Sequence, residues 1–200
     1  MAFIQLGQPG RAAKLMVTDD DLPASTRARR LIVLARAAQA LGHAGANQLR
    51  GALELLGPGG STVLRFGAQL DLARELAAVD AVCLSREVRV EAERRDLLAI
   101  AQHASIREVE CLLRANEAAQ AAALAQAMLA RLPDCHPSDI YVAEAWWVAF
   151  RAFEGVPECR HQAHETLLRG SPGSTASHSV TCPMSSGTAS SIATRSIGPS

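Results

Sequence analysis

Hydrophobic and polar residues recur along most of this chain with the period of an α-helix, about 3.6 residues. The clearest example lies between residues 24 and 42, where one side of the predicted helix is kept apolar by Ala28, Leu31, Ala35, Ala38 and Leu41. Glycine and proline interrupt the periodicity at Gly42, in the GPGG segment at residues 57–60 and at Pro133. Because these residues end helices, the pattern predicts a series of helices joined by short turns.

The interruptions divide the chain into eight predicted helices, at about residues 24–42, 47–56, 61–76, 80–94, 97–114, 117–132, 140–154 and 158–168. Ser61 or Thr62, Asp80, and Ser138 or Asp139 are placed to cap three of them. The first helices of successive pairs begin about 36–43 residues apart, a period typical of helical solenoids. We therefore predict an all-α fold of stacked antiparallel helical hairpins, with an ordinary helical bundle as the alternative.

One stretch, IYVAEAWWVAFRAFE at residues 140–154, contains five of the seven aromatic residues of the chain. Its predicted helix has one apolar face formed by Ala143, Trp146, Phe150 and Phe153. Buried aromatic rings remove much apolar surface from water, so we expect this helix to anchor the core. An exposed aromatic partner site is the alternative. The candidate residues for either role are Tyr141, Glu144, Trp146, Trp147, Phe150 and Phe153.

Composition narrows the class of protein further. Hydrophobic residues make up 48% of the 200 residues but aromatic residues only 4%, a mixture that favours closely packed helices. Twenty basic and twenty acidic side chains balance, so direct binding to nucleic acid is not expected. No apolar run approaches the roughly 18–20 residues of a membrane span, and the N-terminus lacks a signal-peptide pattern. These features predict a cytoplasmic protein without a membrane partner.

Few residues are arranged in a way that indicates chemistry. The five cysteines form no CxxC pair, which indicates reduced thiols. Cys159, His161 and His164, with Cys135 and His136 upstream, fit no standard zinc spacing, so a small helical metal protein is only a remote alternative. The GPGG segment lacks the lysine and hydroxyl residue of a phosphate-binding loop. We expect no enzyme activity, no cofactor and no metal ion. A modest basic cluster, more typical of a solvated face, consists of Arg27, Arg29, Arg30, Arg36 and Arg50.

Two sets of residues resemble a known family. The segments LGQPGRAAKL, LGHAGANQLRGALELL and ANEAAQAAALAQAMLARLP are similar to the second helix of a tetratricopeptide repeat (TPR), although the tryptophan and tyrosine of the first helix are absent from most copies. Residues 140–170 resemble the C-terminal end of the TPR-type region in large bacterial signal-transduction ATPases and transcriptional activators of the MalT-like or AAA type. The matching residues are Glu144, Trp146, Trp147, Ala149, Arg169 and Gly170. The resemblance implies a TPR-like α-solenoid.

The chain departs from that family after Gly170, where a VAWI segment is expected and a serine-rich sequence follows instead. Its few large apolar residues cannot repay the entropy of ordering, which predicts a disordered tail. With suitable synonymous codons, reading one base earlier recovers VAWI and a later HRNP segment, so we predict a frameshifted remnant. The expected organisation is a partial leading repeat and loop at 1–23, a helical-repeat domain at 24–170 and a tail at 171–200.

Together these patterns predict a non-catalytic protein-interaction or regulatory module, a truncated C-terminal part of a bacterial transcriptional regulator or signalling ATPase. A free-standing helical adaptor or chaperone is the alternative. The expected partner is a protein or peptide, including other domains of a regulatory ATPase. Without the VAWI segment, the last hairpin should remain uncovered around Leu167 and Leu168, which predicts self-association there.

Overall fold

The computed structural model describes residues 8–10, 22–134 and 142–170, and no strand occurs in these ranges. Eight long helices carry the fold: α3 (Ala24–Ala40), α4 (Ala46–Leu56), α5 (Thr62–Ala73), α6 (Ala78–Arg94), α7 (Leu98–Arg114), α8 (Ala118–Arg131), α9 (Val142–Glu154) and α10 (Arg160–Gly170). Two short 3₁₀ helices, η1 (Leu132–Asp134) and η2 (Pro157–Cys159), follow α8 and precede α10. The predicted all-α fold is confirmed.

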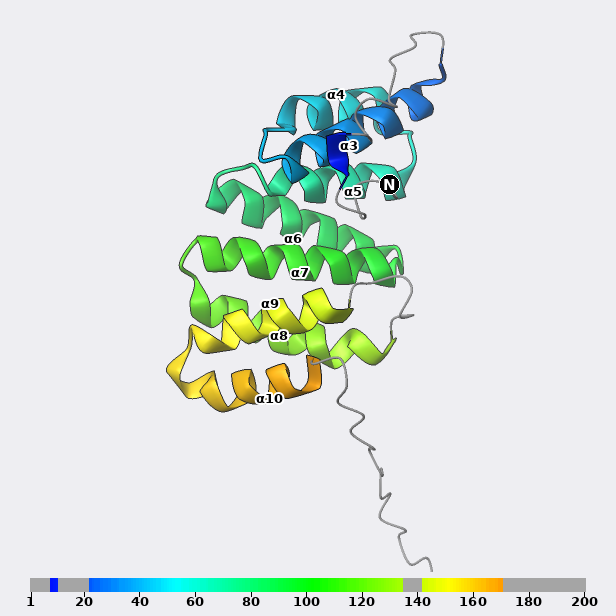
Figure 1. Cartoon of the computed structure of the whole chain (residues 1–200). Helices are drawn as coiled ribbons and strands as arrows, with labels where there is room; N and C mark the ends of the chain where they lie inside the picture. The colour runs from blue at the N-terminus through cyan, green and yellow to red at the C-terminus, as the bar shows by residue number, and fades with distance from the viewer. Residues whose placement is uncertain (1–7, 11–21, 135–141, 171–200) are drawn as a thin grey trace, which may run out of the picture.

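The helices form antiparallel hairpins that stack in chain order, α3 with α4, α5 with α6, α7 with α8 and α9 with α10 (Figure 1). The turns within the hairpins lie along one edge of the stack, on the left in Figure 1. Helices α6 and α7 also pack closely across the boundary between two hairpins, so the core continues from one hairpin into the next. The predicted stacking of neighbouring hairpins is therefore confirmed.

The first helices of the hairpins, α3, α5, α7 and α9, also contact one another and form what we call the inner layer. The second helices make no comparably extensive contacts with one another in the described ranges. Closer approach of one row than the other is expected where a helical stack curves, and the closer row then lies on the shorter, concave side. The inner layer is therefore the concave side of the stack.

Some predicted helix ends need correction. Helix α5 ends at Ala73 rather than near residue 76, and the Glu75 side chain beyond it accepts a hydrogen bond from the first residue of α4. Ser61 is the residue before α5, but its side chain makes no capping hydrogen bond. Asp80 lies in the first turn of α6 rather than at its cap, where a carboxylate still suits the positive end of the helix. The predicted caps at Ser138 and Asp139 lie outside the described residues.

Glu75 joins the first two hairpins. Its carboxylate accepts hydrogen bonds from the backbone N–H groups of Gly45 (2.8 and 3.0 Å) and Ala46 (2.8 Å) and from the Gln39 side chain (2.6 Å). These N–H groups open α4 and have no acceptor within the helix, and a negative charge is favourable at that end. A residue that follows α5 therefore caps α4 and holds α3 against it.

Helix α7 is the centre of the core. It packs against α6 and α8 and also contacts α5 and α9 of the inner layer. Nine of its residues are buried: Ala101, Gln102, Ala104, Ser105, Ile106, Glu108, Val109, Cys111 and Leu112. Helix α9, which we expected to anchor the core, has five buried residues. The helix with more buried residues is thus α7, which has no phenylalanine, tyrosine or tryptophan.

The buried face of α9 is rotated from the predicted one. Its buried residues are Ala145, Val148, Ala149, Ala152 and Phe153. Ala143, expected inside, is exposed, whereas Trp146 and Phe150 are half-buried and pack against the edge of the core. Small alanine side chains let α8 and α10 approach this face closely, and the larger rings are accommodated beside it. The prediction was therefore right for Phe153 and wrong for Ala143.

A buried ion pair joins the second and third hairpins. The Glu108 carboxylate on α7 accepts hydrogen bonds from Nε of Arg86 and of Arg89 on α6, each at 2.8 Å. Its side chain is only 2% exposed. Because a buried carboxylate needs such partners, this cluster fixes how α6 lies against α7.

Candidate anion-binding pocket

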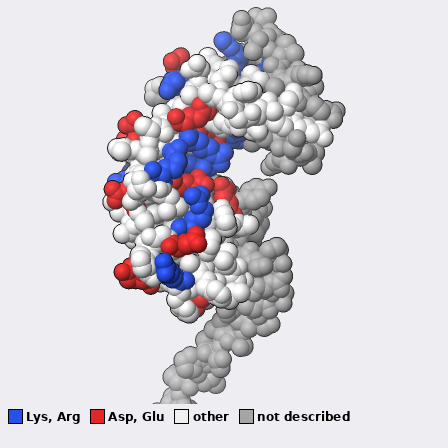
Figure 2. Space-filling view, turned by 60° about the vertical axis from the view of Figure 1, so that its left-hand side comes forward, with Lys and Arg blue, Asp and Glu red and all other residues white. Residues whose placement is uncertain are grey.

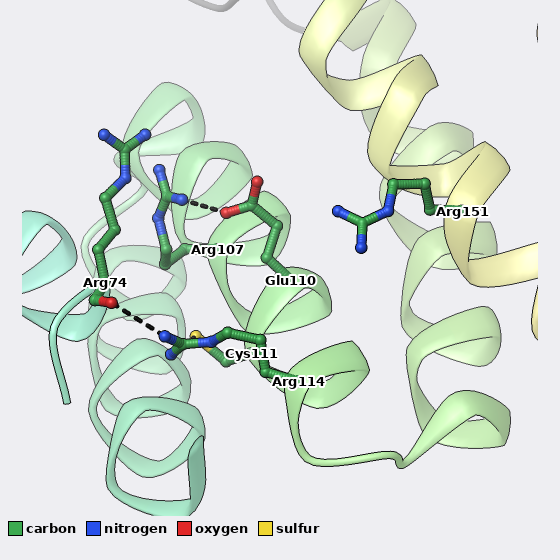
Figure 3. A pocket seen from close by; sticks show the side chains of 6 residues that line it. All are labelled: Arg74, Arg107, Glu110, Cys111, Arg114 and Arg151. Atoms are coloured by element: carbon green, nitrogen blue, oxygen red, sulfur yellow. Dashed lines mark hydrogen bonds and ion pairs between the residues drawn. The ribbon is translucent and has the colours of Figure 1, made fainter. Parts of the chain in front are cut away.

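A pocket of about 260 Å³ opens on the inner layer (Figure 3). Four arginines, one glutamate and one cysteine line it: Arg74, Arg107, Glu110, Cys111, Arg114 and Arg151. They come from the end of α5, from α7 and from α9, which belong to three successive hairpins. The stacking of hairpins thus gathers arginines that lie far apart in the sequence.

Helix periodicity explains how α7 contributes to the pocket. Arg107, Glu110 and Arg114 occur at positions i, i+3 and i+7, which share one face of a helix. Arg74 is the residue directly after α5, and Arg151 lies in the last turn of α9. Arg74, Arg114 and Arg151 lie at or near the helix ends that lead into the turns within hairpins, whereas Arg107 lies near the middle of α7. The pocket therefore depends on how α5, α7 and α9 are aligned in the stack.

Arg114 forms a fixed wall of the pocket. Its guanidinium donates hydrogen bonds to the backbone carbonyls of Arg74 (2.9 Å) and Ala73 (3.0 Å). These carbonyls end α5, where a positive charge is favourable. The same side chain lies 3.4 Å from the Cys111 sulfur. The donors of Arg114 are largely committed to the protein itself.

Arg107 lies deepest of the arginines and has a side chain that is 12% exposed. It forms an ion pair with Glu110, and a longer one of 4.0 Å with Glu144. Its Nε is buried and has no hydrogen-bond partner among the described residues. Burial is the largest influence on its pKa and lowers it; Glu110 opposes this change, Arg74 adds to it, and Glu144 opposes it. A partly desolvated cation of this kind attracts an anion more strongly than an exposed one does.

Arg74 and Arg151 are the accessible cations of the pocket. Arg74 lies 4.0 Å from a Glu144 oxygen, a separation that makes an ion pair but is too long for a hydrogen bond. Arg151 is exposed and has no hydrogen bond or ion pair with any described residue. In Figure 3 its side chain extends from α9 toward Glu110. Both guanidinium groups therefore have donors that can bind a ligand.

The charges continue along the inner layer beyond the pocket. Arg36 of α3 pairs with Asp71 of α5 at 2.5 Å, while Glu144 of α9 lies between Arg74 and Arg107. Figure 2 shows basic and acidic side chains alternating along the stack. Arg36, one of the arginines of the predicted basic cluster, thus forms an ion pair that joins the first two hairpins.

The structure separates the site residues predicted from the sequence. Glu144 borders the pocket. Trp147 lies three residues after Glu144 and four before Arg151, so it shares their face of α9, and it is 54% exposed. Its ring lies 5.5 Å from that of Phe150. Trp146, Phe150 and Phe153 pack in or against the core, and Tyr141 lies outside the described residues.

The four pocket arginines do not stand out in the sequence. The one local signal was the spacing of Arg107, Glu110 and Arg114 on a single helix face, which also fits an ordinary solvated surface. Their meeting with Arg74 and Arg151 depends on how the hairpins stack, and one sequence does not contain that information.

Other candidate sites are weaker. No group of three or more histidine, cysteine and acidic side chains in the described part of the chain could hold a metal ion. His161 pairs with Glu165 at 3.5 Å, and Cys159 packs beside the core. Cys135 and His136 lie outside the described residues. None of the described helices is long and apolar enough to cross a membrane.

The fold and the pocket define a class: an all-α stack of helical hairpins that has an arginine-lined pocket on its inner layer. Comparisons of the chain with protein-family models, with curated proteins and with solved structures found no match.

Proposed function

We propose that this chain is a non-catalytic helical-repeat module that binds an acidic segment of a protein or peptide partner on its inner layer. The observation that carries the proposal is the meeting of four arginines from three hairpins around one pocket. Clusters of arginine recognise acidic and phosphorylated motifs because the guanidinium fork matches the oxygens of both.

The size and polarity of the pocket support binding of a partner's charged group. Pockets for small molecules usually have volumes of 300–1,000 Å³ and mostly apolar walls. This pocket, at about 260 Å³, is smaller and is lined mainly by charged side chains. The exposed Trp147, on the same face of α9 as Arg151, adds an apolar contact of the kind enriched in binding hot spots.

The wider context that we propose is regulatory. The resemblance of Glu144, Trp146 and Trp147 to the end of TPR-type regions supports a role as part of a bacterial transcriptional regulator or signalling ATPase, acting in the cytoplasm. In that context the acidic segment would belong to another domain of the same system or to a separate protein partner.

The test is a binding measurement with a fluorescein-labelled glutamate-rich peptide, followed by fluorescence anisotropy. We expect the wild-type chain to bind and the double variant Arg74→Gln/Arg151→Gln to bind at least about tenfold more weakly. Arg29→Gln removes an exposed arginine on α3, away from the pocket, and serves as the matched control. Raising the salt concentration should weaken wild-type binding. Equal binding by the double variant and the wild type would contradict the proposal.

A further inference from the structure

Resting on the proposed function, we propose that the pocket is a subsite for a phosphoryl group, the dianion of a phosphomonoester, held between Arg74, Arg107 and Arg151. The group is carried by a phosphorylated side chain of the partner or by a free phosphomonoester. Both sources present the same terminal chemistry to the pocket.

The number of arginines favours a phosphoryl group over a carboxylate. A carboxylate has two oxygens and is satisfied by one bidentate guanidinium. A phosphomonoester has three acceptor oxygens and a charge of about −1.5 to −2 near pH 7. Arg74 directly follows α5, Arg107 lies on α7 and Arg151 lies on α9, so the three arginines reach the pocket from three successive hairpins. Three separate guanidinium groups suit a ligand with three oxygens better than one with two.

The charge balance of the pocket also favours a phosphoryl dianion over a carboxylate. The four arginines of the lining face two carboxylates, Glu110 in the lining and Glu144 at its border. Two positive charges therefore remain without a negative counterpart in this group. A singly charged carboxylate leaves one of them unbalanced, whereas a dianion balances both. Because Arg107 is partly desolvated, the charge of a ligand affects the binding free energy more strongly here than on an open surface.

The pocket also has the right size. The pocket volume of about 260 Å³ is enough to hold several water molecules. This space accommodates a phosphoryl group and some of its hydration. The rest of the ligand then lies on the open inner layer, where Trp147 is exposed.

Glu144 acts as an internal competitor of the ligand. It lies 4.0 Å from both Arg74 and Arg107, which keeps the two guanidinium groups together without taking their hydrogen bonds. An incoming phosphoryl group forms those bonds and meets the repulsion of this carboxylate. Removing the Glu144 charge should therefore strengthen phosphoryl binding.

The experiment measures binding of O-phospho-L-serine, a phosphoserine peptide and L-glutamate to the full chain by calorimetry and tryptophan fluorescence. The variants are Arg74→Gln, Arg151→Gln and Glu144→Gln, with Arg29→Gln as the control. Thermal melting of each variant establishes that it is folded. We expect O-phospho-L-serine to bind at least about tenfold more tightly than L-glutamate, with each pocket-arginine variant losing at least about tenfold. Glu144→Gln should bind about two- to threefold more tightly, and Arg29→Gln should bind as the wild type does.

The results separate the two proposals. If the glutamate-rich peptide binds through Arg74 and Arg151 but phosphoserine binds no better than glutamate, the phosphoryl subsite is wrong and the acidic-partner proposal stands. If neither ligand binds, both are wrong. Weaker phosphoserine binding by a folded Glu144→Gln variant would also overturn the subsite. A phosphoserine peptide that binds more tightly than the free amino acid identifies a partner-borne group as the source, and equal affinities identify a free phosphomonoester.

Discussion

Glu108 shows how strongly a single charged residue can constrain this fold. Its carboxylate is buried on α7 and is bonded by Arg86 and Arg89 of α6. We expect Glu108→Gln to lower the free energy of unfolding by roughly 1.5–3 kcal/mol, because hydrogen bonds to a charged group are lost and Arg89 loses its buried partner. Chemical denaturation measures the change. Glu87→Gln, at an exposed position of the neighbouring helix α6, is the control and should change stability by less than about 0.5 kcal/mol.

The Glu108 prediction is contradicted if Glu108→Gln and the control have the same effect. The burial of Glu108 could not be predicted from the sequence, where Glu108 is one of two acidic residues, with Glu110, on the same helix. Only the packing of α6 on α7 reveals that this acid, unlike its neighbours, is inside.

Glu91 gives a prediction about pH. Hydrogen bonds from Arg94 and then from Arg95, with smaller charge effects, lower the pKa of Glu91 from 4.5 to about 2. A carboxylate whose pKa is lower in the folded state stabilises that state above its unfolded pKa, and the contribution disappears as the pH falls through the folded value. The difference in stability between the wild type and Glu91→Gln should therefore be present at pH 7 and vanish near pH 2.

The direct measurement for Glu91 is an NMR titration of its side-chain carboxyl. A midpoint near the ordinary value of 4.5 would show that the two arginines do not hold the carboxylate in solution. Because the group is exposed, added salt should move the midpoint back toward that value.

At the scale of single elements, local signals in the sequence determined where helices begin and end. Gly42 and the GPGG segment separate helices as expected, and α4, α7 and α9 lie within about two residues of their predicted ranges. The orientation of α9 was harder to predict because two overlapping stripes of its surface are apolar. Tight packing of alanines outweighed the burial of the larger rings, and local hydrophobicity does not contain that preference.

The orientation of α9 predicts which of its aromatic residues contributes most to the free energy of unfolding. Phe153→Ala should lower the free energy of unfolding by about 3–5 kcal/mol, since the ring is 3% exposed and its removal leaves a cavity. Trp146→Ala should cost less than Phe153→Ala, because Trp146 is only partly buried. Trp147→Ala serves as the exposed control and should cost under about 1 kcal/mol. A loss at Trp147 equal to that at Phe153 would show that α9 packs through a different face.

At the scale of the whole molecule, regular spacing was enough to predict a stack of hairpins, since each pair of helices can bury its apolar side only against its neighbours. The pocket could not be predicted in this way. Arg74 and Arg151 are separated in the sequence by three helices, α6, α7 and α8, and they line one pocket only because α5 and α9 both pack against α7. The stacking of the hairpins, rather than any sequence motif, brings these residues together.

The stack also predicts how stability is distributed. Helix α7 has neighbours on both sides, whereas α3 and α10 are the outermost helices of the described stack. On α10, Leu167 and Leu168 are 45% and 58% exposed. Amide hydrogen exchange should therefore be slowest in α7 and fastest in α3 and α10, because terminal units open without disrupting the centre. Protection of α10 equal to that of α7 would indicate that another structure covers the end of the stack.

The origin of the pocket residues in three successive hairpins has a mechanical consequence. Bending the stack moves the end of α5 relative to the end of α9, so the distance between Arg74 and Arg151 changes with the curvature of the whole molecule. An anion bound to both guanidinium groups, as proposed above, would resist this motion. Binding in the proposed pocket would thereby stiffen the part of the stack that runs from α5 to α9.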